Sequence, residues 1–201
     1  MGVGEAVEAV RDGLPVILPT DTVYGLCASC YREAPVERLR RLKGTPAEQP
    51  IALLAADLEV VLDAVPELRG RAAVLARALF PAALTLILPN PARRFRWLTG
   101  LDPTKIGIRV PDLPAASRDV LDRVGAVAAT SANVHGGRDP ATPSEIPDEI
   151  WKGAGVLLDA GELPGTPSTV LDLTNAQPRV LREGAVSADE ALATIARVAS
   201  E

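Results

Sequence analysis

Residues 16–26 read Val-Ile-Leu-Pro-Thr-Asp-Thr-Val-Tyr-Gly-Leu. The apolar run Val16–Leu18 predicts a buried strand, which stops at a proline and opens into two hydroxyls, a carboxylate and a phenol. Polar groups at the end of a buried strand are typical of one edge of a ligand site. Gly25 lets the backbone come close to a bound molecule. The same residues also suit an ordinary turn, so this stretch alone leaves both interpretations open.

The composition indicates an acidic globular protein that can bury a substantial core. Of its 201 residues, 47% are hydrophobic and 23% are charged, and the formal net charge is −5. This acidity disfavours a surface built to coat nucleic acid, because phosphates demand clustered positive charge. No apolar run reaches membrane-spanning length, and the N-terminus has an amphipathic helix pattern rather than a signal peptide. We therefore expect a cytoplasmic protein that makes no membrane contact.

Apolar periodicity, caps and turn residues divide the chain into alternating helices and strands. Helices are predicted over residues 3–12, 35–42, 57–64, 71–79, 113–124, 144–151 and 187–200. Strands are predicted over residues 15–18, 24–29, 51–55, 85–88, 106–110, 126–129, 156–158, 169–173 and 179–181. This pattern favours a single α/β domain over residues 1–201, with a mixed sheet flanked by helices.

The two cysteines, Cys27 and Cys30, form a Cys-x-x-Cys pair. Two thiols without a nearby histidine cannot complete a four-ligand zinc site within one chain. If residues 24–29 form a strand, side chains three positions apart point to opposite faces. We therefore expect ordinary packing cysteines, and we expect no metal site of the protein's own.

Three charged or polar positions combine a structural interpretation with a ligand-binding one. Lys43, at the end of a predicted helix, suits either a helix-end cation or a phosphate contact. The Ser131–Asn133 segment suits either a turn or a ligand site at a strand end. Arg109 lies in an apolar strand and needs an anionic partner, which is either Asp21 or a substrate carboxylate. The chain has no P-loop and no Rossmann turn, so a bound ATP would be held by scattered donors.

Further short motifs complete the pattern: Lys43–Pro46, Phe80–Thr85, Ile108–Pro111, Thr130–Asn133, Pro167–Val170 and Leu181–Gly184. In this order and at these spacings, the chain resembles the YrdC-like family, the threonylcarbamoyl-adenylate synthases of tRNA modification. The resemblance extends over about residues 3–184. It implies a twisted, largely antiparallel mixed sheet of about seven strands with helices on both sides and a ligand cleft.

The resemblance also implies an activity. Family members are nucleotidyltransferases that condense L-threonine, bicarbonate and ATP into L-threonylcarbamoyl-adenylate with release of pyrophosphate. Mg²⁺ would arrive with the nucleotide. The product would pass to tRNA-modification machinery for N6-threonylcarbamoyladenosine formation.

The family's ligand positions carry over to this chain residue by residue. They imply an L-threonine site made of Thr22, Tyr24, Arg109 and Ser168. They imply an ATP site made of Lys43, Gln49, Thr85, Ser131, Asn133 and Arg182. Lys43 is also implied as the catalytic cation.

The chain departs from the family pattern at Thr45, where arginine is usual, and at Ala82 and Ala83, where the family has glycine and proline. These changes leave open a catalytically altered paralogue that binds nucleotide. An RNA-binding module that uses a concave face of the sheet is a second alternative. Residues 93–97 combine arginines with two aromatic side chains, which suits RNA contacts, a lid over the cleft or a solvated loop. The net negative charge favours the enzyme over direct RNA binding.

Overall fold

The computed structural model of the chain describes residues 2–199. Within them a nine-stranded sheet has the order β7-β1-β2-β6-β3-β5-β4-β8-β9. Its strands are β1 (Val16–Pro19), β2 (Tyr24–Ser29), β3 (Ala52–Ala55), β4 (Leu84–Pro89), β5 (Lys105–Arg109), β6 (Ala126–Ser131), β7 (Val156–Leu157), β8 (Thr169–Asp172) and β9 (Arg179–Arg182). The expected count of about seven strands is therefore wrong. The sheet ends in the two-residue β7 and in β9, whose four residues are all exposed.

The sheet is mixed and largely antiparallel, as predicted. Strand β1 pairs with β7 in parallel, as do β3 with β5 and β4 with β8. The other neighbouring pairs are antiparallel. The parallel pairing of β4 with β8 joins two strands that lie far apart in the sequence.

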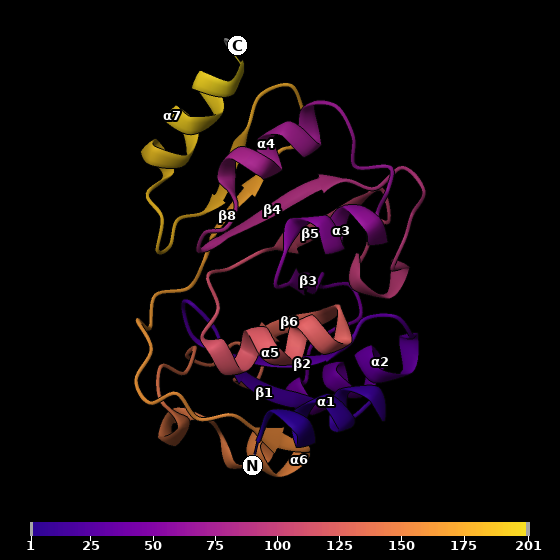
Figure 1. Ribbon diagram of the computed structural model, residues 1–201, viewed down its shortest axis with the longest axis vertical. Coiled ribbons are helices and arrows are strands. Elements are labelled where there is room, and N and C mark those ends of the chain that lie inside the picture. The colour runs from indigo at the N-terminus through magenta and orange to yellow at the C-terminus, as the bar shows by residue number, and fades with distance from the viewer. Residues whose placement is uncertain (1, 200–201) are drawn as a thin grey trace.

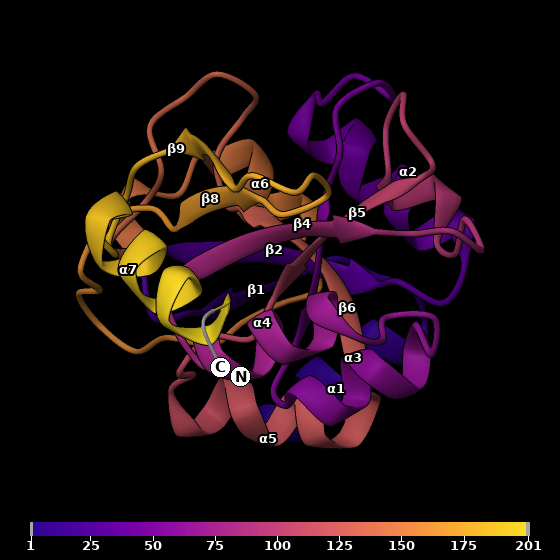
Figure 2. The same cartoon turned by 90° about the horizontal axis from the view of Figure 1, so that it is seen from above.

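The helices are α1 (Val3–Arg11), α2 (Glu33–Lys43), α3 (Leu58–Ala64), α4 (Arg71–Leu79), α5 (Ala115–Val124), α6 (Asp148–Gly153) and α7 (Ala188–Ala199), with short 3-10 turns at Arg96–Leu98 and Pro143–Glu145. In Figure 1, α3, α4 and α7 accompany strands β3, β4, β5 and β8, whereas α1, α2, α5 and α6 surround β1 and β2. Figure 2 shows helices on both sides of the sheet, with α1 and α5 opposite α2. Among the described residues, none of the helices is long and apolar enough to cross a membrane.

Local sequence explains most helix limits. Asp57 caps α3 by accepting a hydrogen bond from the Glu59 amide, and Ser187 accepts one from the Glu190 amide at the start of α7. The predicted helix over residues 144–151 is instead two short pieces, because Pro147 separates them. The last position of the predicted helix over 187–200, and residues 1, 200 and 201 of the predicted domain, lie outside the described residues.

The core has two parts, one on each face of the sheet. Cys27 lies in the part that includes α1 and α5, whereas Cys30 lies in the part that includes α2. Both thiols are free and buried, and burial raises the pKa of each to about 12. The prediction of packing cysteines on opposite faces is confirmed.

Candidate ligand-binding cleft

A cleft of about 450 Å³ opens over the middle of the sheet, a volume typical of small-molecule sites. Strands β2, β3, β4, β5, β6 and β8 all contribute to it. The hydroxyl groups in its wall belong to Thr20, Thr22, Thr85, Thr99, Thr130, Ser131 and Ser168. The charged side chains in its wall are Glu48, Asp102, Lys105, Arg109, Asp139 and Arg182. Hydroxyls and charges of both signs around an apolar floor suit a small, polar ligand.

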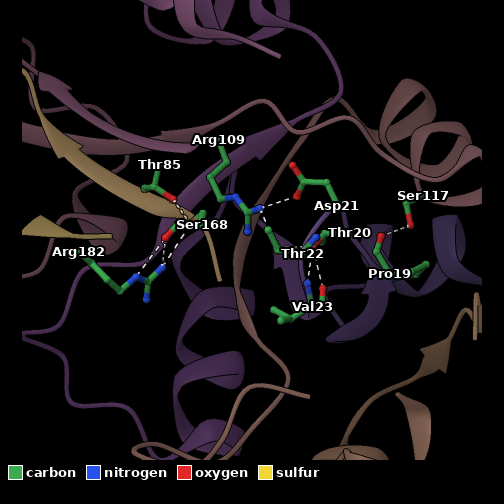
Figure 3. Close-up of polar contacts among 10 residues, drawn as sticks. All are labelled: Pro19, Thr20, Asp21, Thr22, Val23, Thr85, Arg109, Ser117, Ser168 and Arg182. Atoms are coloured by element: carbon green, nitrogen blue, oxygen red, sulfur yellow. Dashed lines mark hydrogen bonds and ion pairs between the residues drawn. The ribbon is translucent and has the colours of Figure 1, made fainter. Parts of the chain in front are cut away.

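One end of the cleft is built where β4 and β8 run side by side. In β4, Leu84 and Leu86 are buried in the core, so the alternating Thr85 faces the cleft. The parallel pairing brings Thr85 beside Ser168, and their hydroxyl oxygens are 2.8 Å apart. From β9, the guanidinium of Arg182 donates to the Ser168 carbonyl at 2.8 Å and 3.1 Å (Figure 3). Three residues from separate motifs thus form one hydrogen-bonded group.

The turn between β1 and β2 forms another part of the wall. The Thr20 hydroxyl donates to the Val23 carbonyl at 2.7 Å and accepts the Thr22 amide at 3.2 Å. Behind the turn, the Ser117 hydroxyl donates to the Pro19 carbonyl at 2.7 Å. These bonds fix the turn, and Figure 3 shows its hydroxyls gathered beside Arg109.

The anionic partner of Arg109 is a side chain of the protein itself. Its guanidinium donates to the Asp21 carboxylate at 2.8 Å and to the Thr22 hydroxyl at 3.1 Å. Burial lowers the pKa of Arg109, although Asp21 opposes that shift, and burial raises the pKa of Asp21, although Arg109 opposes it. The Arg109 Nε and the Asp21 Oδ2 are both buried without a partner. The pair is therefore only partly satisfied beside the cleft.

Lys43 lies behind the wall of the cleft. Helix α2 ends at this residue because Gly44 takes a left-handed conformation, with φ of 72°. The Lys43 ammonium donates to the Ser131 carbonyl at 2.7 Å, to the Asn133 carbonyl at 2.9 Å and to the Asn133 side-chain oxygen. Burial lowers the pKa of Lys43 to about 8. The ammonium thus holds the segment that presents the Ser131 hydroxyl to the cleft.

Tyr24 and Asn133 also lie outside the cleft wall. The Tyr24 hydroxyl donates to the Gly161 carbonyl at 2.8 Å and accepts the Ala160 amide at 3.0 Å. It thereby ties β2 to the segment that leads toward Ser168. The Asn133 side chain is buried and bonds Lys43 and the Gly137 carbonyl.

The structure brings most of the predicted site residues together. Those that line the cleft are Thr22, Gln49, Thr85, Ser131, Arg109, Ser168 and Arg182, whereas Lys43, Tyr24 and Asn133 form the layer behind it. Lys105 also lines the cleft and pairs with Asp172 at 3.1 Å, yet no role was expected for it. The spacing could have indicated a role for Lys105, because residues 105 and 109 lie on the same face of a strand.

The departures at positions 45, 82 and 83 lie outside the cleft wall. Among the described residues, neither Ala82 nor Ala83 has a positive φ, so a glycine's conformational freedom is not needed there. Thr45 is buried, and its hydroxyl has no partner. Arg40, in the last turn of α2, does not line the cleft and donates to backbone carbonyls.

Comparisons of the sequence and of the structure with known proteins give consistent results. Residues 8–184 match the family model Sua5/YciO/YrdC, which carries the description "Telomere recombination". A protein of Mycobacterium tuberculosis is 34% identical over 189 residues, which cover 94% of this chain and 86% of the relative. The threonylcarbamoyl-AMP synthase of Pyrococcus abyssi is 33% identical over 182 residues, but this chain spans only 53% of its length.

Two solved structures have the same fold. The crystal structure of Pyrococcus abyssi Sua5 complexed with L-threonine matches with a TM-score of 0.87 and 30% identity over 96% of this chain and 57% of that one. The crystal structure of Escherichia coli YciO matches with a TM-score of 0.80 and 30% identity, covering 91% and 89% of the two chains. Because the family model matches residues 8–184, which make up most of the chain, this chain belongs to the Sua5/YciO/YrdC family.

Proposed function

We propose that this protein is an L-threonylcarbamoyl-adenylate synthase that condenses L-threonine, bicarbonate and ATP. The observation that carries the proposal is the single cleft that gathers residues expected for both substrates: Thr22, Arg109 and Ser168 for L-threonine, and Gln49, Thr85, Ser131 and Arg182 for ATP. The relative from Pyrococcus abyssi that bears the synthase name, and its structure with L-threonine, support the same substrates.

The reaction needs no covalent intermediate on the protein. The amine of L-threonine attacks bicarbonate, water leaves, and a carbamate forms. A carbamate oxygen then attacks the α-phosphorus of ATP, the bond between the α-phosphorus and the bridging oxygen breaks, and pyrophosphate leaves. The protein must hold the reactants in line and stabilise the charge that develops on the phosphates. A cleft of hydroxyls and cations suits both tasks.

In this proposal the residues behind the wall act through those in it. Lys43 and Asn133 hold Ser131 toward the nucleotide, and Tyr24 fixes the segment that leads to Ser168. Arg182 and Lys105 contribute positive charge beside the phosphates. Lys43 adds a buried charge just behind them.

Mg²⁺ enters this proposal as part of the nucleotide substrate. The described residues contain no group of three or more histidine, cysteine, aspartate or glutamate side chains placed to bind a metal ion. Mg²⁺ keeps several waters and binds phosphate oxygens readily, so it would be carried by ATP. The adenylate product would then be used by tRNA-modification enzymes that transfer its threonylcarbamoyl group to adenosine.

Pyrophosphate release tests the proposal. The protein is incubated with ATP and Mg²⁺, and bicarbonate and L-threonine are omitted in turn or L-threonine is replaced by L-serine. We expect release that depends on both bicarbonate and L-threonine and is weaker with L-serine, which lacks the methyl group. ATP binding without L-threonine-dependent release would favour the altered paralogue. Failure to bind ATP would overturn the proposal.

A further inference from the structure

Arg40 is a buried arginine that the proposed reaction does not use. It lies in the last turn of α2 and its side chain is 4% exposed. Its guanidinium donates to the carbonyls of Pro46 and Gln49 at 2.8 Å and 2.7 Å, and to the carbonyl of Trp97 at 3.1 Å. Among residues 2–199 its guanidinium makes one long ion pair, at 3.9 Å from Glu37, and the charge of Glu48 also acts on it. Burying a guanidinium costs free energy unless its N–H groups form hydrogen bonds. Here those hydrogen bonds connect two separate segments of the chain.

The two segments that Arg40 connects form one end of the cleft. From the first, residues 48–50 line the cleft, and from the second, Thr99, Leu101 and Asp102 do so. The segments also meet directly, since the Ile51 amide donates to the Leu98 carbonyl at 2.8 Å. These contacts hold both loops at a fixed separation.

Gly100 shows how close that approach is. Its φ is 62°, and a β-carbon added there would lie 2.2 Å from the Glu48 carbonyl oxygen. Any other residue would push the two segments apart. Arg40 therefore connects the two segments by hydrogen bonds, and Gly100 allows them to lie this close together.

We propose that Arg40 is a positioning residue for the part of the cleft wall that carries Gln49, acting through the carbonyls of Gln49 and Trp97. This inference rests on the proposed function, which assigns Gln49 to ATP and Thr22, Arg109 and Ser168 to L-threonine. Loss of the guanidinium frees the Gln49 part of the wall, whereas Thr22, Arg109 and Ser168 keep hydrogen bonds that do not involve Arg40.

The test compares Arg40→Ala and Arg40→Lys with Arg38→Ala, all in the full chain. Arg38 lies on the same helix and donates to a single carbonyl, that of Gly13 at 3.2 Å, away from the cleft. We expect Arg40→Lys to raise the KM for ATP about tenfold and the KM for L-threonine less than about twofold, because misplaced binding groups lose affinity for the ligand they face. Arg40→Ala should show a larger effect with the same selectivity, and Arg38→Ala should show none.

Gly100→Ala provides a second route to the same wall if Arg40→Ala does not fold. It should also raise the KM for ATP selectively. Equal changes in both KM values, or no change with Arg40→Lys, would overturn the inference. If the unaltered protein shows no turnover, the proposed function has failed, and hydrogen exchange then decides this inference separately. Faster exchange of the Gln49 and Ile51 amides in Arg40→Lys than in Arg38→Ala supports it, and equal exchange overturns it.

Discussion

Replacing Lys43 by methionine removes the buried ammonium and keeps an unbranched side chain that fills much of the same space. The change takes a donor away from the carbonyls of Ser131 and Asn133, now 2.7 Å and 2.9 Å from the nitrogen. A buried carbonyl left without a donor costs about 1–3 kcal/mol. Relief from burying the ammonium, whose pKa is lowered to about 8 by that burial, offsets part of this cost. We expect the free energy of unfolding to fall by about 1–3 kcal/mol.

The same variant should weaken the ATP end of the cleft, because Ser131 loses the group that holds it. We expect the KM for ATP to rise about tenfold or more, measured by pyrophosphate release, with stability followed by urea unfolding. Lys152→Met is the matched control. Lys152 is exposed and pairs with Asp148 at 2.7 Å within one helix, so its loss should change stability by less than about 0.5 kcal/mol and leave turnover unchanged. Ordinary ATP kinetics in Lys43→Met would refute the role given to this lysine.

Three further predictions follow from named contacts. Since burial lowers the pKa of Lys43 to about 8, turnover should fall as the pH rises above 8, where the neutral amine has too few protons for its acceptors. Stability should change in the opposite direction. Between pH 8 and 10.5 the unfolded chain binds more protons than the folded one, so this lysine's contribution to the free energy of unfolding rises with pH. A parallel loss of stability and activity would contradict the reasoning. Ser168→Ala should raise the KM for L-threonine more than the KM for ATP, whereas equal losses would indicate general damage to the cleft. Gly184→Ala places a β-carbon 2.1 Å from the Pro167 carbonyl oxygen, so urea unfolding should show a loss of about 1–3 kcal/mol, and unchanged stability would contradict the close approach.

Local sequence was sufficient for most elements of the fold. All nine strand candidates are strands, including the one or two that the expected count of about seven left out. Helix α2 ends at Lys43 because Gly44 follows. The sequence was less informative about α6, where Pro147 interrupts the apolar pattern that suggested a continuous helix. The resemblance to a seven-stranded family fold underestimated the sheet, because β7 and β9 are short or exposed edge strands that add little to the core.

The cleft required information that no local pattern holds. Thr85 and Ser168 each follow an apolar or proline-containing stretch, but only the pairing of β4 with β8 places their hydroxyls 2.8 Å apart. Likewise, the motif position of Lys43 predicts a site residue but does not show that its ammonium points at Ser131 from behind the wall. For Arg109 the sequence left two anionic partners open, and the register of the sheet brings Asp21 within 2.8 Å.

The central claim is that this cleft makes a threonylcarbamoyl adenylate, and isotope transfer tests it most directly. The protein is incubated with ATP, Mg²⁺, L-threonine and ¹³C-labelled bicarbonate, and the nucleotide products are separated and analysed by mass spectrometry. The account predicts an adenylate whose mass includes both threonine and the labelled carbon, formed together with pyrophosphate and absent when either L-threonine or bicarbonate is omitted. Only AMP or ADP, or an adenylate without the labelled carbon, would contradict it.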